Sequence, residues 1–195
     1  MKAKYLGTAV LAMAAALAGC GGKTSFTISG TLSGVNNPGL VLANGSEELS
    51  IPVGATSFSF SQTVDYGNNY NVTVKNQPQY MTCTPPSTAG VAGRTESIAI
   101  VIQCVQNTHT VYVTVTGLAE VATGAAQLQL INGTTIQAVT SASPSTGFAG
   151  IPVGTSYGVT IFQQPAGQTC TIANGAGIMG DADRADTVVT CTKNA

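Results

Sequence analysis

One sequence pattern occurs twice in this chain, and its two copies lie 87 residues apart. Each copy has a Gln-Pro pair, a Thr-Cys-Thr segment and a closing cysteine, found at Gln77-Pro78, Cys83 and Cys104, and again at Gln164-Pro165, Cys170 and Cys191. When residues 67–104 are aligned without a gap on residues 154–191, 14 of 38 positions are identical. A fixed period with that level of identity indicates an internal duplication. We therefore expect two similar domains of about 80 residues.

Short strands are indicated throughout both copies. Phe58 and Phe60 alternate with serines, as in a strand with one apolar and one polar face. Asn44-Gly45 and Asn132-Gly133 are strong hairpin signals. Six or seven such segments in each copy, with no helical period, indicate a β-sandwich. The fold class expected is all-β: two tandem Ig-like or prealbumin-like sandwich domains of about seven strands, each with one disulfide, after an N-terminal signal peptide.

Three finer expectations concern individual strands. Residues 49–53 are expected to form a short strand ended by Gly54. In the strand 97–104 both faces are apolar, because Ala99 and Val101 alternate with isoleucines, as expected for a strand well inside a sheet. The quartet Ile-Pro-Val-Gly occurs at 51–54 and 151–154, an offset of 100 that disagrees with the period of 87, so we interpret it as coincidence or local slippage.

The N-terminus has the form of an export signal. Lys2 and Lys4 precede an apolar run, 5–17, which is shorter than the roughly 20 residues that a membrane-spanning helix needs. The run ends in Leu17-Ala18-Gly19-Cys20, which resembles the lipobox of bacterial lipoproteins. In that family the cysteine becomes the lipidated first residue of the mature chain. The resemblance implies that acyl chains on Cys20 hold the protein to a membrane, and the absence of Asp after this cysteine favours the outer membrane. An ordinary signal peptide with an incidental cysteine is the alternative.

The number of cysteines agrees with this interpretation. Five is an odd count, and lipidation of Cys20 leaves four, two in each copy. The simplest connectivity joins the two cysteines of each copy, so we expect the disulfides Cys83–Cys104 and Cys170–Cys191. A four-cysteine zinc site is disfavoured, because such sites use closely spaced pairs that this chain lacks.

These features together give a predicted domain organisation. It comprises a lipoprotein signal peptide (1–19), a lipidated tether (20–25), a first sandwich (26–104, here repeat 1), a linker (105–108), a second sandwich (109–192, here repeat 2) and a C-terminal tail (193–195). A linker of that length is too short to give the domains independent reach.

Chemistry-bearing side chains are scarce. His109 is the only histidine, and we expect it at the surface on a strand edge. Asp181, Asp183 and Asp186 are a weak calcium candidate, because hard cations prefer several carboxylates, although the spacing does not fit an EF-hand loop and a solvated turn is the alternative. A pocket that joined His109 with two carboxylates and a hydroxyl would favour an enzyme.

The strand order resembles prealbumin-like and collagen-adhesin B-type sandwiches. The Gln-Pro and Thr-Cys segments with their closing cysteine are also similar to Cys-containing repeats of bacterial surface proteins. Adhesins of the B type carry Lys-Asn isopeptide bonds, but repeat 2 has no lysine before Lys193, so this feature is not expected there.

The function expected is that of a lipid-anchored, non-catalytic structural or adhesion-type module of the bacterial cell envelope. The alternative is a module that binds a glycan or a periplasmic protein partner through loops or a strand edge. No nucleic-acid partner is expected, because the seven basic residues form no basic stripe. We expect no cofactor, no catalytic residues and a monomer, with the membrane as a partner through the lipid on Cys20. Exposed tyrosines such as Tyr80 and Tyr112 could contact a glycan or protein partner.

Overall fold

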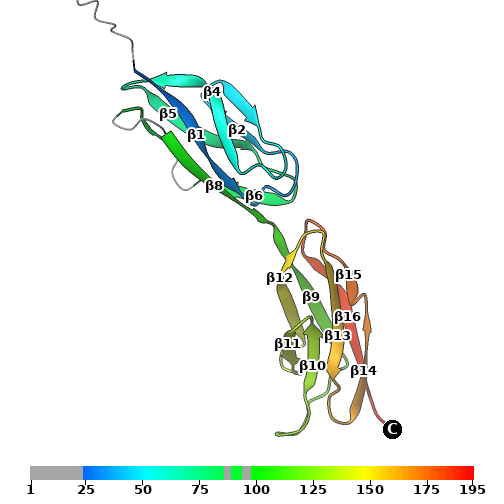
Figure 1. Cartoon of the computed structure of the whole chain (residues 1–195). Coiled ribbons are helices and arrows are strands. Elements are labelled where there is room, and N and C mark those ends of the chain that lie inside the picture. Colours follow the sequence, from blue (N-terminus) through cyan, green and yellow to red (C-terminus); the bar gives the residue numbers. More distant parts are fainter. Residues whose placement is uncertain (1–23, 86–88, 94–97) are drawn as a thin grey trace, which may run out of the picture.

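The computed structural model describes residues 24–85, 89–93 and 98–195. The signal peptide and Cys20 lie outside the described residues, so the prediction of lipidation is not tested by the fold. The described chain forms two all-β domains arranged end to end (Figure 1). Tandem β-sandwich domains, each with one disulfide, are confirmed. Within the described ranges, no helix has the length and apolar character needed to cross a membrane.

Repeat 1 contains two four-stranded sheets. Its described strands are β1 (Ser25–Ser33), β2 (Val41–Asn44), β3 (Glu47–Ser50), β4 (Ser57–Asp65), β5 (Asn69–Asn76), β6 (Met81–Thr84), β7 (Ala89–Val91) and β8 (Ile98–Gln106). One sheet has the order β4-β1-β8-β6 and the other β3-β2-β5-β7. The first and last strands, β1 and β8, pair in parallel, and the other pairs are antiparallel.

Repeat 2 reproduces this topology strand for strand. Its strands are β9 (Thr108–Thr116), β10 (Leu128–Asn132), β11 (Thr135–Val139), β12 (Ser145–Pro152), β13 (Ser156–Gln163), β14 (Gln168–Ala173), β15 (Ala176–Ile178) and β16 (Arg184–Lys193). The sheets have the orders β12-β9-β16-β14 and β11-β10-β13-β15, with β9 and β16 parallel. The structure therefore supports the duplication that the sequence period indicates.

Each domain buries its own core between its two sheets. Apolar residues at alternate positions of the strands point inward, as in β8, where every second residue from Ile98 to Cys104 is buried. The largest fully buried side chains include Ile28, Leu42 and Ile102 in repeat 1 and Leu128 and Leu130 in repeat 2. The two clusters of buried residues share no member, so each sandwich has a separate core.

Two expectations about strands need correction. Eight strands occur in each repeat among the described residues, where about seven were expected. The two that were missed, β7 and β15, have three residues each and contain a central glycine, which gives no strand signal. The strand expected at 49–53 is β3, Glu47–Ser50, because the hairpin at Asn44-Gly45 brings residues 47–50 opposite β2. β8 lies inside its sheet, between β1 and β6, as the apolar pattern of 97–104 indicates, and Val101 on its outer face is exposed.

The two Ile-Pro-Val-Gly quartets occupy different places in the fold. The Gly54 amide donates to the Val35 carbonyl in the loop before β4, whereas the Gly154 amide donates to the Met179 carbonyl after β12. The residue of repeat 1 that corresponds to Gly154 is Gly67, whose amide donates to the Ala92 carbonyl in the same way. The match at an offset of 100 therefore has no structural counterpart.

Candidate functional site

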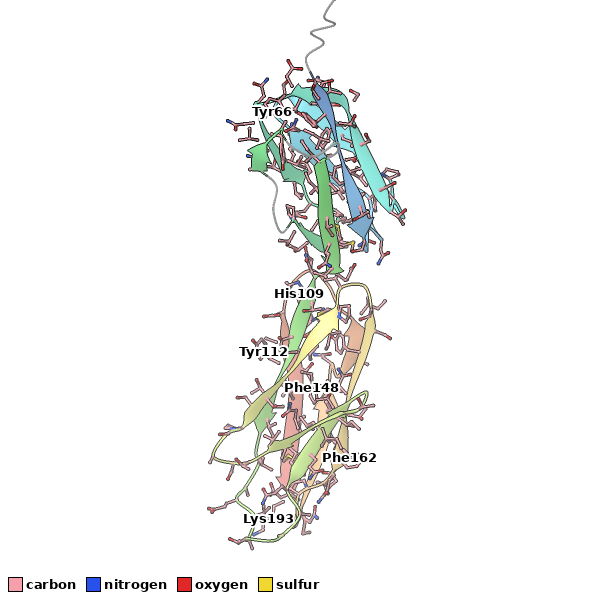
Figure 2. All side chains as sticks on the ribbon, turned by 60° about the vertical axis from the view of Figure 1, so that its left-hand side comes forward. Tyr66, His109, Tyr112, Phe148, Phe162 and Lys193 are labelled. Carbon is pink, nitrogen blue, oxygen red and sulfur yellow. A yellow bond between two sulfur atoms is a disulfide. The ribbon has the colours of Figure 1, made fainter. Side chains whose placement is uncertain are left out.

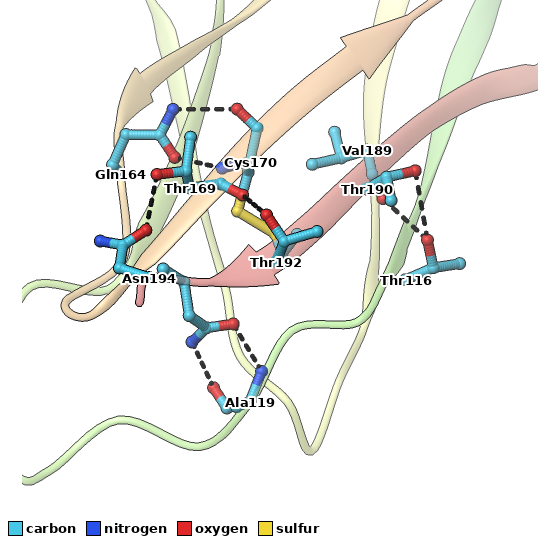
Figure 3. Close-up of a disulfide and its surroundings, with 11 residues drawn as sticks. Thr116, Ala119, Gln164, Thr169, Cys170, Val189, Thr190, Thr192 and Asn194 are labelled. Carbon is cyan, nitrogen blue, oxygen red and sulfur yellow. Dashed lines mark hydrogen bonds between the residues drawn. A yellow bond between two sulfur atoms is a disulfide. The ribbon is translucent and has the colours of Figure 1, made fainter.

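The Gln-Pro pair of each repeat protects a free sheet edge. The Cys83 amide donates to Gln77 Oε1 at 2.7 Å, and Gln77 Nε2 donates to the Cys83 carbonyl at 3.1 Å. Gln164 makes the same two bonds with Cys170, at 2.8 and 3.0 Å (Figure 3). A primary amide offers one donor and one acceptor side by side, so it pairs with a single extended residue as a neighbouring strand would. Because β6 and β14 are edge strands, the glutamine occupies a position where another chain could otherwise pair.

The cysteine that bonds the glutamine in each repeat also forms the disulfide. Cys83 is opposite Cys104 on β6 and β8, and Cys170 is opposite Cys191 on β14 and β16. The bridges Cys83–Cys104 and Cys170–Cys191 both have a sequence separation of 21 residues. The cysteines are buried, which is consistent with a structural rather than a redox-active pair.

An equivalent asparagine, Asn107 or Asn194, follows the closing strand of each repeat, and we call this position the joint. After the closing strand of repeat 1, the Asn107 amide donates to the Tyr80 carbonyl and its Oδ1 accepts from Thr82 Oγ1 at 2.8 Å. At the end of repeat 2, Asn194 makes the same contacts, with its amide on the Gly167 carbonyl and its Oδ1 accepting from Thr169 Oγ1 at 2.7 Å. The joint thus belongs to the repeated unit.

Val153 of repeat 2 forms hydrogen bonds with the joint of repeat 1. The segment predicted as a linker, 105–108, is mostly strand, because β8 ends at Gln106 and β9 begins at Thr108. The Val153 amide donates to the Asn107 carbonyl at 3.0 Å, and Gln106 Nε2 donates to the Val153 carbonyl at 3.2 Å. Val153 is only 6% exposed, yet it is not a member of the core of repeat 2. It is therefore covered at the junction between the domains.

His109 lies at the end of repeat 2 that faces repeat 1 (Figure 2), on the inner strand β9 rather than on an edge strand as expected. Its Nε2 is 3.3 Å from Asp181 Oδ1, and its Nδ1 is 3.4 Å from Asp183 Oδ1. Asp183 Oδ1 also accepts the Thr110 amide at 2.8 Å. Both ring nitrogens face carboxylates, so neither is directed at a hydroxyl that it could activate.

The three aspartates of the weak calcium candidate do not converge. Asp181 and Asp183 face His109, whereas Asp186 accepts two hydrogen bonds from Arg184, at 2.6 and 3.1 Å. Hydrogen bonding from the Arg184 side chain lowers the pKa of Asp186 below its ordinary value. In the part of the chain that the structure describes, no three His, Cys, Asp or Glu side chains are grouped so that they could hold a metal ion.

A shallow hollow lies on the outer face of β6 and β8 in repeat 1. It has a volume of about 380 Å³ and is lined by Thr82, Thr84, Val101, Gln103 and Val105. This lining contains no carboxylate, imidazole or thiol. The hollow therefore combines hydrogen-bonding groups with apolar surface.

The outer faces of the second sheets differ between the repeats. In repeat 1, Lys75 on β5 pairs with Glu48 on β3. The residues at the corresponding positions of repeat 2 are Phe162 on β13 and Ile136 on β11, which are 56% and 46% exposed. Phe162 follows Ile161 at a register shift between β10 and β13, where an extra residue lies on β13. Sequence reasoning missed this patch, because its residues come from separate strands.

No family model matches the chain, and no curated protein matches it. Among solved structures, the chain is similar to the TIE protein of Bacillus anthracis, with a TM-score of 0.57 and 12% identity over 87% of this chain and 34% of that one. It thus spans about a third of that protein.

Superposition on the minor pilin GBS52 of Streptococcus agalactiae gives a TM-score of 0.34 with 10% identity, over 88% of this chain and 97% of the pilin. A streptococcal ancillary pilin gives 0.31 with 13% identity, over 88% and 63% of the two chains. These two superpositions fall below a TM-score of 0.5 and support no argument. The likeness to the Bacillus protein shows a shared fold.

Proposed function

We propose that this chain is a lipid-anchored protein of the bacterial cell envelope whose two stacked sandwiches form a non-catalytic structural and interaction module. The observation that carries the proposal is the junction. Asn107 alone separates β8 from β9, and both backbone polar groups of Val153 are bonded to the joint. Two domains joined in this way act as one spacer rather than as independent modules.

The size of the module fits this role. A nine-residue strand such as β1 or β9 extends about 30 Å, and the two domains lie end to end (Figure 1). With Cys20 lipidated, repeat 2 is carried several tens of Å from the membrane, an estimate that follows from strand length. Stable anchoring requires more than one acyl chain, which the lipoprotein resemblance supplies.

The spacer function is tested by comparing two valine variants in solution scattering. Val153→Asp places a charge in the covered junction, so the two domains are expected to sample a wider range of angles. Val53→Asp is the matched control, because this valine lies in the other Ile-Pro-Val-Gly quartet and is already 53% exposed. Equal scattering curves for Val153→Asp and the wild type would contradict a junction that holds the domains in line.

The anchor and the orientation are tested separately. Mass spectrometry of the N-terminal peptide, with Cys20→Ser as the control, determines whether acyl chains are attached. Proteinase K treatment of intact and lysed cells, followed by detection of repeat 2, then distinguishes surface display from the periplasm. Loss of repeat 2 on intact cells supports an adhesion role, and protection until lysis directs the search to envelope partners.

A second candidate function is recognition of a glycan or protein partner. Exposure of Phe162 beside a second apolar residue, Ile136, favours it, since aromatic side chains are enriched at protein interfaces. A strand-edge mode is disfavoured at β6 and β14, where Gln77 and Gln164 already bond the edge. Pull-down from envelope extracts with the wild type and with Ile136→Glu/Phe162→Lys tests this candidate, and equal recovery of every partner by both proteins excludes this face.

A further inference from the structure

We propose that the end of repeat 1 opposite repeat 2 rests on the lipid headgroups of the membrane, with the Tyr66 side chain inserted among them. This inference rests on the proposed lipid anchor at Cys20. Tyr66 is 64% exposed and lies at the far end of repeat 1 from the junction (Figure 2). Matching backbone contacts where the chain enters each repeat support the proposal.

Tyr66 occupies the position in repeat 1 that Val153 occupies in repeat 2. The Tyr66 amide donates to the Thr24 carbonyl at 2.8 Å, as the Val153 amide donates to the Asn107 carbonyl. The next residue, Gly67 or Gly154, donates in each case to the matching carbonyl before the closing strand. The chain therefore enters both repeats in the same way, and in repeat 2 the residue at this position is covered by the body that precedes it.

The short chain ahead of Thr24 identifies what covers Tyr66. Thr24 is four residues from Cys20, and four residues reach at most about 14 Å even when fully extended. With Cys20 acylated, Thr24 lies within that distance of the bilayer surface. The backbone of Tyr66 is only one hydrogen bond further away. The sequence leaves no room for another domain between the anchor and repeat 1.

The chemistry of this end suits a headgroup layer. Tyrosine has an apolar ring and a polar tip, and it is enriched where membranes meet water. The Phe26 ring lies 6.5 Å from the Tyr66 ring, between centroids, and Asp65 pairs with Ser25 in the β1–β4 ladder, so the position of Tyr66 is fixed by strand pairing. The three residues that follow, 67–69, are uncharged, so the contact does not require anionic lipid.

The absence of tryptophan from the chain provides a direct experiment. Full-length acylated protein carrying Tyr66→Trp is reconstituted in phosphatidylcholine vesicles with brominated or ordinary acyl chains. Tyr112→Trp is the matched control, because Tyr112 is also an exposed tyrosine but belongs to repeat 2 (Figure 2). We expect brominated lipid to remove most of the indole emission of the Tyr66→Trp variant and to leave that of the Tyr112→Trp variant unchanged.

Each outcome bears on the inference. An acylated Tyr66→Trp protein whose emission is not quenched overturns the membrane contact but leaves the anchor intact. Equal quenching of the two variants also overturns it, because the molecule then lies flat on the bilayer. Absence of acyl chains from the N-terminal peptide overturns the anchor and this inference together. Should Tyr66→Trp fail to fold by circular dichroism, Asn68→Trp in the same exposed segment gives the same readout.

Discussion

The same sheet face carries an ion pair in repeat 1 and apolar side chains in repeat 2. Glu48 and Lys75 interact across β3 and β5, whereas Ile136 and Phe162 stand exposed at the corresponding positions of β11 and β13. The strand order, the disulfide and the glutamine pair at the sheet edge are the same in both repeats. Duplication has therefore kept the parts that make the sandwich stable, while the outer surface of one copy has become available for contacts.

A second difference between the repeats concerns the loop between their first two strands. It is linked to the residue that begins the edge strand, β6 in repeat 1 and β14 in repeat 2. In repeat 1 this loop is short, and the first residue of β6 is the buried Met81. In repeat 2 the loop is longer, and Gln168 replaces the methionine: it accepts from the Ala119 amide at 2.9 Å and donates to the Ala119 carbonyl at 3.2 Å. The longer loop is thus fixed by the same amide geometry that protects the sheet edges.

The largest effect is expected from removing the disulfides. Replacing both cysteines of one bridge by alanine should cost about 3 kcal/mol, because each bridge closes a loop of similar length in the unfolded chain. Urea unfolding of Cys83→Ala/Cys104→Ala and Cys170→Ala/Cys191→Ala measures the two losses. Equal losses are expected, and a clear difference would show that the repeats do not depend on their bridges in the same way.

The next effect comes from exchanging the first residues of β6 and β14. Met81→Gln places an amide in an apolar site without partners and should cost about 1–3 kcal/mol. Gln168→Met removes two hydrogen bonds and should cost about 1 kcal/mol. Unfolding free energies measure both changes, and hydrogen exchange at Ala119 reports whether the loop is released. Unchanged protection of that amide in Gln168→Met would contradict the role given to Gln168.

Exchanging the outer faces should alter association more than stability. Glu48→Ile/Lys75→Phe and Ile136→Glu/Phe162→Lys should each change the unfolding free energy by less than about 1 kcal/mol, since exposed ion pairs contribute little. Binding of a hydrophobic dye is expected to rise in the first double variant and fall in the second. The opposite result would show that the patch on repeat 2 is not an accessible apolar surface.

The smallest effect concerns pH. Glu47 accepts hydrogen bonds from the Ser61 hydroxyl and from the Ser61 and Gln62 amides, with the Ser61 hydroxyl as the main cause, and these lower its pKa. A lowered pKa in the folded state stabilises the protein above the ordinary glutamate pKa of 4.5, and this contribution is lost as pH falls through the folded value.

The carboxylate is exposed, so the loss in repeat 1 should be small. Glu47→Gln is expected to remove this part of the pH dependence, measured by thermal unfolding between neutral and acid pH. Asp186→Asn tests the same sign in repeat 2, where Arg184 lowers the pKa of Asp186. Acid stability that is unaffected by either substitution would contradict the assignment.

Features that depend on residues close together in the sequence, or on the period of the duplication, were predicted correctly. The hairpins at Asn44-Gly45 and Asn132-Gly133 occur as expected, with the two glycines at φ of 60° and 59°. One disulfide per sandwich is likewise confirmed. Each of these features depends on adjacent residues or on the period of the duplication.

Features that depend on strands distant in sequence were not predictable in this way. The contact of His109 with Asp181 and Asp183 joins β9 to the segment before β16, and no spacing rule connects them. The burial of Val153 depends on a neighbouring domain, because Tyr66, at the corresponding position of repeat 1, is exposed. Exposure of Val101 has the same origin: apolar alternation indicates a strand, but whether another layer covers its outer face is decided by the rest of the fold.

The joint formed by Asn107 and repeated at Asn194 has an evolutionary consequence. The unit that was copied includes its closing asparagine, which an equivalent threonine and an equivalent backbone carbonyl hold in both copies, whereas Gln106, which bonds Val153, is Lys193 in repeat 2. A gene segment with this property can be multiplied by unequal recombination with the backbone part of its connector already in place. Length then becomes a heritable trait that changes in equal steps, one domain at a time.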